Sequence, residues 1–184
     1  WNGIIKKYSG RNQLEQQLES VKKKKPTFAN NMKFMFKYQL GWMYWRYFMW
    51  NFAGRQNDIQ NVLGNSLEGN WISGIKFLDE WRLGIPQDIP ASLQYNKAHN
   101  TFFFLPLILG ILGIIVMYQK SKMDFYTVLT LFLFTGLLVV VYLNQPPMEP
   151  RERDYSSVGS FQTFCIWIGL SVLFLVDLLK KSVN

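Results

Sequence analysis

The sequence has little of what metal centres and disulfide-stabilised folds are built from. Its 184 residues include one cysteine, Cys165, and one histidine, His99. No internal disulfide is possible, and no His/Cys metal cluster, phosphate-binding glycine loop or nucleophile–base arrangement is present. We therefore predict no metal site. Because Cys165 lies in an apolar run, we expect it to be a small buried side chain.

The N-terminus lacks the apolar core of a signal peptide, since Trp1–Gly10 contains no apolar run. It also lacks an initiator Met, so we expect the chain to be part of a longer protein. Acidic residues are outnumbered 12 to 20 by basic ones, which gives a net charge of +8. Nucleic-acid binding, which a basic charge can indicate, suits the apolar second half of the chain poorly.

The second half contains three long apolar segments. A bilayer core about 30 Å thick requires roughly 20 helical residues. In lipid the backbone must satisfy its own hydrogen bonds, so such segments must be helical. We predict an all-α membrane protein in which an extramembrane and interfacial region, 1–100, precedes a transmembrane region, 101–184. The transmembrane helices are expected at about 101–118, 125–143 and 161–179.

Met32–Phe52 is unusually aromatic, with three Trp and three Tyr interrupted by Lys37, Gln39 and Arg46. The embedded polar groups disfavour a spanning helix. Aromatic rings and basic side chains suit the headgroup level of a membrane, so we predict an interfacial helix at about 32–52. A re-entrant segment is the alternative.

Two polar clusters are candidate anion sites. In the connection Asn144–Tyr155, three prolines stiffen the chain and charged residues follow, among them Arg151 and Arg153. Guanidinium groups bind phosphate in a two-pronged geometry. The alternative is a solvated turn in which these arginines pair with neighbouring acids. The second cluster, Arg55–Asp58, has the alternative of a polar helix terminus.

Several strings suggest a family. They are Met43–Asp58 (MYWRYFMWNFAGRQND), Gly69–Ile75 (GNWISGI), and Tyr142–Gln145 with Pro150–Tyr155 and Gly159–Phe161. These strings resemble a family of large bacterial inner-membrane proteins of GT-C type, related to protein O-mannosyltransferase-like membrane proteins. The resemblance covers roughly Pro26 to Leu179.

The resemblance implies the membrane portion of a GT-C-like glycosyltransferase that transfers a sugar from a polyprenyl-phosphate donor, with protein as the expected acceptor. The reaction would occur on the non-cytoplasmic face of the bacterial inner membrane, where residues 1–100 and 144–160 would lie. The implied donor phosphate-binding residues are Arg151, Arg153, Arg55 and Arg46. The implied polar support comes from Asp154, Tyr155, Asn57 and Asp58.

The family's acidic Asp-x-Gly-Glu-type motif has no match in this sequence, so catalytic residues are not assigned. The competing interpretation is a non-catalytic membrane scaffold, or a subunit of a larger membrane complex. In either case membrane lipids are the expected partners. If the chain is part of an enzyme, a protein acceptor is a further expected partner.

Overall fold

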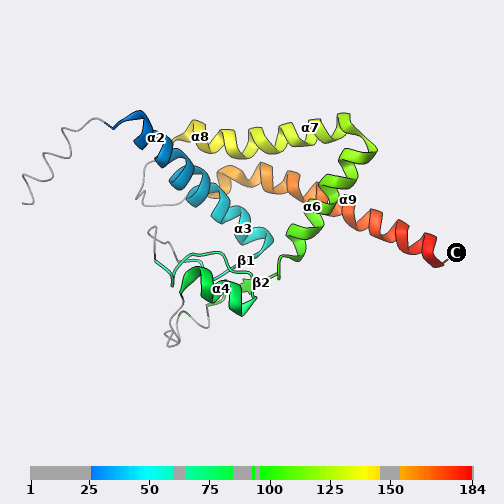
Figure 1. Ribbon diagram of the computed structural model, residues 1–184, viewed down its shortest axis with the longest axis horizontal. Coiled ribbons are helices and arrows are strands. Elements are labelled where there is room, and N and C mark those ends of the chain that lie inside the picture. The colour runs from blue at the N-terminus through cyan, green and yellow to red at the C-terminus, as the bar shows by residue number, and fades with distance from the viewer. Residues whose placement is uncertain (1–25, 60–64, 85–92, 94–95, 146–153, 184) are drawn as a thin grey trace, which may run out of the picture. The chain divides into compact units, whose positions relative to one another are not determined.

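The computed structural model describes residues 26–59, 65–84, 93, 96–145 and 154–183 (Figure 1). The chain divides after Phe34 into two compact units. In the first unit, helix α2 covers Phe28–Phe34. Thr27 precedes it and accepts a hydrogen bond from the Asn30 amide at 3.3 Å, which satisfies one N–H of the first turn.

The second unit begins at Met35 and is mostly helical. A two-stranded antiparallel sheet pairs β1, Gly54–Arg55, with β2, Asn100–Thr101. The helices, in chain order, are the π-helical η1 (Met35–Trp45), α3 (Arg46–Phe52), α4 (Lys76–Leu83), α6 (Leu105–Lys120), α7 (Lys122–Leu133), η2 (Phe134–Leu138), α8 (Val139–Leu143), the short 3-10 helix η3 (Asp154–Ser157) and α9 (Val158–Val183).

Among the described residues, two apolar helices are long enough to cross a membrane, judged by length and composition. α7, η2 and α8 together form Lys122–Leu143, which has 22 residues and contains an 18-residue window with a mean hydropathy of 2.2. η3 and α9 contribute Tyr155–Ser182, which has 28 residues and contains an 18-residue window with a mean hydropathy of 1.9. They contain two of the predicted segments, 125–143 and 161–179, and confirm that these are helical.

The first predicted apolar segment gives a shorter helix than expected. Phe103 and Phe104 have φ angles of 52° and 58°, in the left-handed region, so the helix begins only at Leu105. Pro106 stands in its first turn, where a missing N–H is tolerated. The resulting α6 has 16 residues, or about 24 Å of helix. Of the three predicted spans, two therefore reach membrane-spanning length in the described residues.

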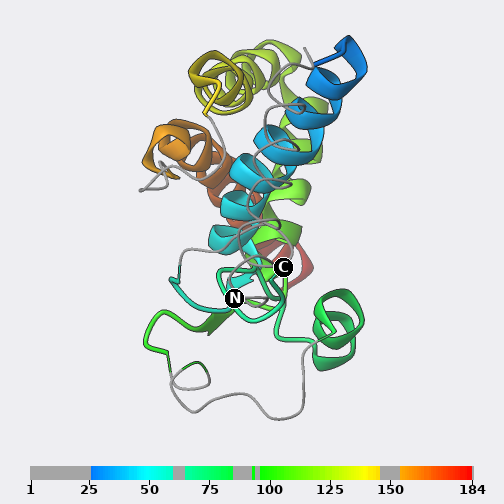
Figure 2. The same ribbon diagram turned by 90° about the vertical axis from the view of Figure 1, so that its left-hand side faces the viewer.

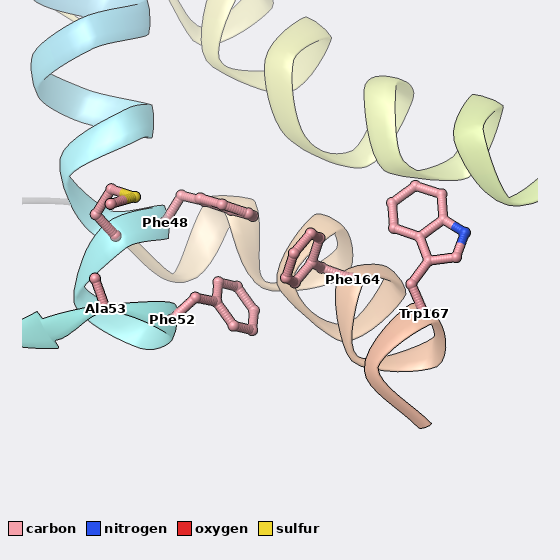
Figure 3. Packing of buried hydrophobic residues seen from close by; sticks show 6 residues of the cluster. Phe48, Phe52, Ala53, Phe164 and Trp167 are labelled. Carbon is pink, nitrogen blue, oxygen red and sulfur yellow. The ribbon is translucent and has the colours of Figure 1, made fainter. Parts of the chain in front are cut away.

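The core lies where α3 meets α9 (Figure 3). Phe48 and Phe52 from α3 pack on Phe164 from α9, with ring centroids 4.9 Å and 4.5 Å apart. Trp167 is one turn further along α9, points toward α7, and is 1% exposed. Cys165, between these two core residues, faces outward and is exposed, so the prediction that it is buried was wrong.

Met35–Phe52 is helical, as predicted for the aromatic stretch, but protein covers five of its aromatic side chains, Tyr44, Tyr47, Phe48, Trp50 and Phe52. Phe36 and Trp45 are exposed. Tyr44 donates a hydrogen bond to Ser160 on α9 at 3.2 Å. Gln39 donates one to Asn144, the residue after α8. The helix thus lies along the apolar helices over much of its length. Its predicted position at a membrane interface stays a prediction.

α6 and α9 approach each other most closely at two glycines. A methyl group on Gly110 would overlap the Phe164 ring, and one on Gly113 would overlap the Trp167 carbonyl. Glycines at such contacts allow helix backbones to pack closely. In Figure 1, α6 crosses from the sheet toward the start of α7.

Candidate functional site in the lobe between α3 and α6

Residues 53–104, called the lobe, leave the helical core at the end of α3 and return at the start of α6. The two ends are held together by the sheet, in which Gly54 pairs with Thr101. Just outside the sheet, the Phe102 amide donates to the Ala53 carbonyl at 2.9 Å. The lobe is therefore anchored to both helices at one place, and Figure 2 shows it at one end of α3.

Asn57 is the polar centre of the lobe and is fully buried. Its Nδ2 donates to the Leu67 carbonyl at 2.8 Å, while its Oδ1 accepts from the Gly69 amide at 2.7 Å. The preceding Gln56 holds Asn70 in the same way, since its Oε1 accepts from the Asn70 Nδ2 at 3.1 Å. Buried amides keep their position only when bonded, so these residues fix the loop 65–70 against β1.

Arg46 is buried in protein, with an exposed fraction of 2%. Its Nη1 donates to the Gly69 carbonyl at 2.9 Å. Its guanidinium carbon lies 4.3 Å from the ring centroid of Trp42 and 5.0 Å from that of Trp50. Ring faces and carbonyl oxygens offset the cost of removing this cation from water. These contacts position Arg46 as a support for the loop at Gly69.

Arg55 shares the Trp50 ring with Arg46, because both guanidinium groups stack on it. The Arg55 guanidinium carbon is 4.7 Å from the Trp50 ring centroid. Its side chain is half-buried, and its Nε–H has no hydrogen-bond partner among the described residues. Asp58, three residues later, is exposed and accepts a hydrogen bond from Asn96 at 3.1 Å.

The structure thus brings together three of the predicted site residues, Arg46, Arg55 and Asn57. Gly69 connects two of them, since it donates to Asn57 and accepts from Arg46. Arg55 is linked to Arg46 through the Trp50 ring. Of the two arginines, Arg55 is the more accessible to a ligand, because Arg46 is almost fully enclosed.

The other predicted phosphate-binding residues, Arg151 and Arg153, lie outside the described residues. Asp154 is the first residue of η3, and Tyr155 after it is 60% exposed. That this connection lies on the same side of the membrane as Arg55 stays a prediction.

Asp79 and Arg82 on α4 were not singled out from the sequence. Asp79 is 7% exposed and accepts hydrogen bonds from the Ser73 amide at 2.8 Å, the Ser73 hydroxyl at 3.0 Å and the Gly74 amide at 2.9 Å. Arg82 donates to the Trp71 carbonyl and stacks 3.7 Å from the centroid of the Trp71 ring. Burial lowers the pKa of Arg82, while the nearby Asp79 carboxylate acts in the opposite direction. The sequence places Asp79 six residues after Ser73, but this spacing alone does not predict a contact between them. The fold brings the two side chains together.

Within the described ranges, no three His, Cys, Asp or Glu side chains gather to hold a metal ion. The candidate site is cationic and aromatic, because Arg55 of the lobe stacks on Trp50 of α3, which the enclosed Arg46 also contacts. Such a cluster can bind an anion next to a flat apolar group.

Comparisons of this chain with protein-family models, curated proteins and solved structures found no match.

Proposed function

We propose that the chain is the membrane-embedded portion of a multi-pass protein. The observation that carries this proposal is the exposure of its most apolar helices. The apolar windows of Lys122–Leu143 and Tyr155–Ser182 are only 11% and 22% buried. Leaving apolar area in water costs about 25 cal/mol per Å², so helices of this composition are stable only in apolar surroundings. A bilayer provides such surroundings over a thickness that both helices match.

In this proposal α6 is the third membrane helix. Its 16 residues are short for a bilayer core of about 30 Å, but local thinning of the bilayer accommodates short spans at modest cost. Three crossings would put Lys120, Lys122, Lys180 and Lys181 on one side, which we take as the cytoplasm of a bacterium. The lobe and the connection before η3 would then share the non-cytoplasmic side.

Extraction of membranes at alkaline pH tests the insertion. The chain should stay in the membrane pellet, because its apolar helices cannot enter water. Release into the supernatant, at a level matching a peripheral control protein, would contradict the proposal.

For its activity, we propose a GT-C-like glycosyltransferase that uses a polyprenyl-phosphate-linked sugar and modifies protein. Two of the strings that carry the family resemblance, Met43–Asp58 and Gly69–Ile75, are bonded to each other through Asn57 and Gln56. This supports the view that they form one functional unit. In that unit Arg55 is the best-placed described residue for the donor phosphate, with Trp50 beneath it.

The alternative is a non-catalytic scaffold or subunit. The burial of Arg46 favours it, because one of the arginines expected to bind phosphate instead supports the backbone at Gly69. A scaffold also needs the hydrogen bonds that hold the lobe together, but it does not need a cation that binds a ligand.

The complete protein in proteoliposomes distinguishes the two, with tritiated mannose and glucose on polyprenyl phosphate as probes. If Arg55 stabilises the departing phosphate, Arg55→Ala should reduce transfer by about 2 kcal/mol of activation free energy, or about 30-fold. Arg55→Lys should keep an intermediate rate, because it retains the charge but loses the two-pronged geometry.

Lys97→Ala is the matched control, since it removes the same charge from an exposed position of the lobe. It should leave transfer unchanged. Wild-type protein that inserts normally yet transfers neither sugar would favour the scaffold. Transfer that Arg55→Ala leaves intact would remove Arg55 from the site.

A further inference from the structure

α4 buries the charged Asp79 and exposes its two aromatic side chains. On a surface helix of a water-soluble domain, the apolar face points inward. In α4, Phe77 and Trp81 are 77% and 79% exposed, whereas Asp79 is 7% exposed. Phe77 and Trp81 are four residues apart and therefore neighbours on one helical face.

This orientation is fixed by the hydrogen bonds of the inward face. Asp79 accepts hydrogen bonds from the backbone amides of Ser73 and Gly74 and from the Ser73 hydroxyl. Arg82 is held by the Trp71 carbonyl and ring. Turning α4 to hide its aromatic side chains would break these bonds and leave Asp79 without its donors. The outward position of Phe77 and Trp81 is therefore part of the folded lobe.

The residues just before α4 contact Phe103, just before α6. The Phe103 amide donates to the Ser73 carbonyl at 3.0 Å, and the Phe103 ring lies beside Gly74, directly before α4. Phe103 is 58% exposed, and Leu105 and Ile108 at the start of α6 are 63% and 59% exposed. Exposed apolar side chains thus continue from a proposed lipid-facing helix onto the lobe.

We infer that α4 docks on the bilayer, with Phe77 and Trp81 inserted at the boundary between headgroups and acyl chains. The occupant is lipid because exposed apolar side chains lead from α6 through Phe103 to Gly74, directly before α4. The sheet also ties the lobe to the end of α3 and the start of α6. Trp and Phe are the side chains that favour this depth. Lys76, paired with Glu80 at 3.8 Å on the flank of the helix, is 88% exposed and reaches the headgroup level. Figure 2 shows α4 at the outer edge of the lobe. The inference rests on the proposed membrane insertion.

Site-specific fluorescence in proteoliposomes of three parts phosphatidylcholine to one part phosphatidylglycerol tests it. In a Cys165→Ala background, single cysteines carry the fluorophore NBD at four positions, in the variants Phe77→Cys, Trp81→Cys, Lys97→Cys and Leu173→Cys. Two quenchers are compared, a lipid with a spin label high on its acyl chain and aqueous iodide. Leu173 reports on α9, where it is 64% exposed, and Lys97 is the exposed polar reference in the lobe.

The expected result is quenching at positions 77 and 81 by the labelled lipid, at least threefold stronger than at position 97, with weak quenching by iodide. Strong iodide quenching at 77 and 81 would overturn the inference, since the face would then be in water. Protection from both quenchers would also overturn it and indicate a protein partner. Position 173 keeps the two proposals apart, because loss of lipid quenching there would refute the membrane insertion itself.

Discussion

Gly113 makes the sharpest prediction about how the helices pack. A methyl group at this position would overlap the carbonyl of Trp167, which belongs to the backbone of α9. A side chain could turn aside, but a helix backbone can yield only by moving as a whole. We therefore expect Gly113→Ala to separate α6 from α9 and to loosen the packing of Trp167, which is 1% exposed.

Two opposing terms set the size of the effect. Overpacking a closely packed contact costs about 1–3 kcal/mol, and the backbone overlap puts Gly113 at the upper end. Alanine is favoured over glycine within a helix by about 1 kcal/mol. The net loss of stability is then about 2 kcal/mol. Gly110→Ala should cost less, because it meets the side chain of Phe164 and not the backbone of α9.

Gly169 provides the matched control, because a methyl group there meets nothing within 4 Å. Unfolding of the purified protein in mixed detergent and SDS micelles, followed by tryptophan fluorescence, ranks the three variants. We expect Gly113→Ala to unfold at the lowest SDS fraction, Gly110→Ala next, and Gly169→Ala no earlier than wild type. A Gly113→Ala variant as stable as Gly169→Ala would refute the close approach of the two helices.

The lobe makes two further predictions. Asn57→Asp should destabilise the protein by about 2–4 kcal/mol in the same assay, because it replaces the donor to the Leu67 carbonyl with a buried charged oxygen. If the variant is as stable as wild type, Asn57 is not enclosed. Asp79→Asn should cost about 1–3 kcal/mol, because one amide oxygen cannot accept all three hydrogen bonds. Glu80→Gln, with the same charge change on an exposed side chain, should leave stability unchanged, and equal losses in both variants would contradict the hydrogen-bond account.

The apolar helices were predictable because their signal is local. A charge-free run such as Phe125–Leu143 needs no partner to identify it as a helix. The exception, the start of α6, depends on two consecutive phenylalanines in the left-handed region, a conformation that sequence gives no reason to expect of Phe. Cys165 shows the same limit. Its apolar neighbours suggested burial. However, the orientation of α9 relative to α3 decides which α9 side chains face the core, and Cys165 is not one of them.

The candidate site was only partly predictable, because residues of the same type differ in burial and in contacts once the chain is folded. Arg46 and Arg55 have the same chemistry in the sequence, yet one is enclosed by rings and the other is half-exposed. That difference depends on the loop at Gly69, which meets Arg46 from 23 residues away. The spacing of residues within Met43–Asp58 does not predict a contact with Gly69, which belongs to another string.

Two features of the second unit support its proposed insertion in a membrane, namely its buried polar side chains and its exposed apolar side chains. Its fully buried side chains include Asn57, Ser73 and Ser160, which are polar. Its exposed side chains include Leu173 and Tyr142, at 64% and 86%, on the two longest apolar helices. A protein that folds in water excludes apolar surface first and tolerates buried polar groups as a cost. Here these three polar side chains are hydrogen-bonded inside, next to an aromatic core, while much apolar surface remains outside. Lipid removes the penalty for that surface, and it equally requires the internal hydrogen bonds that the buried side chains make.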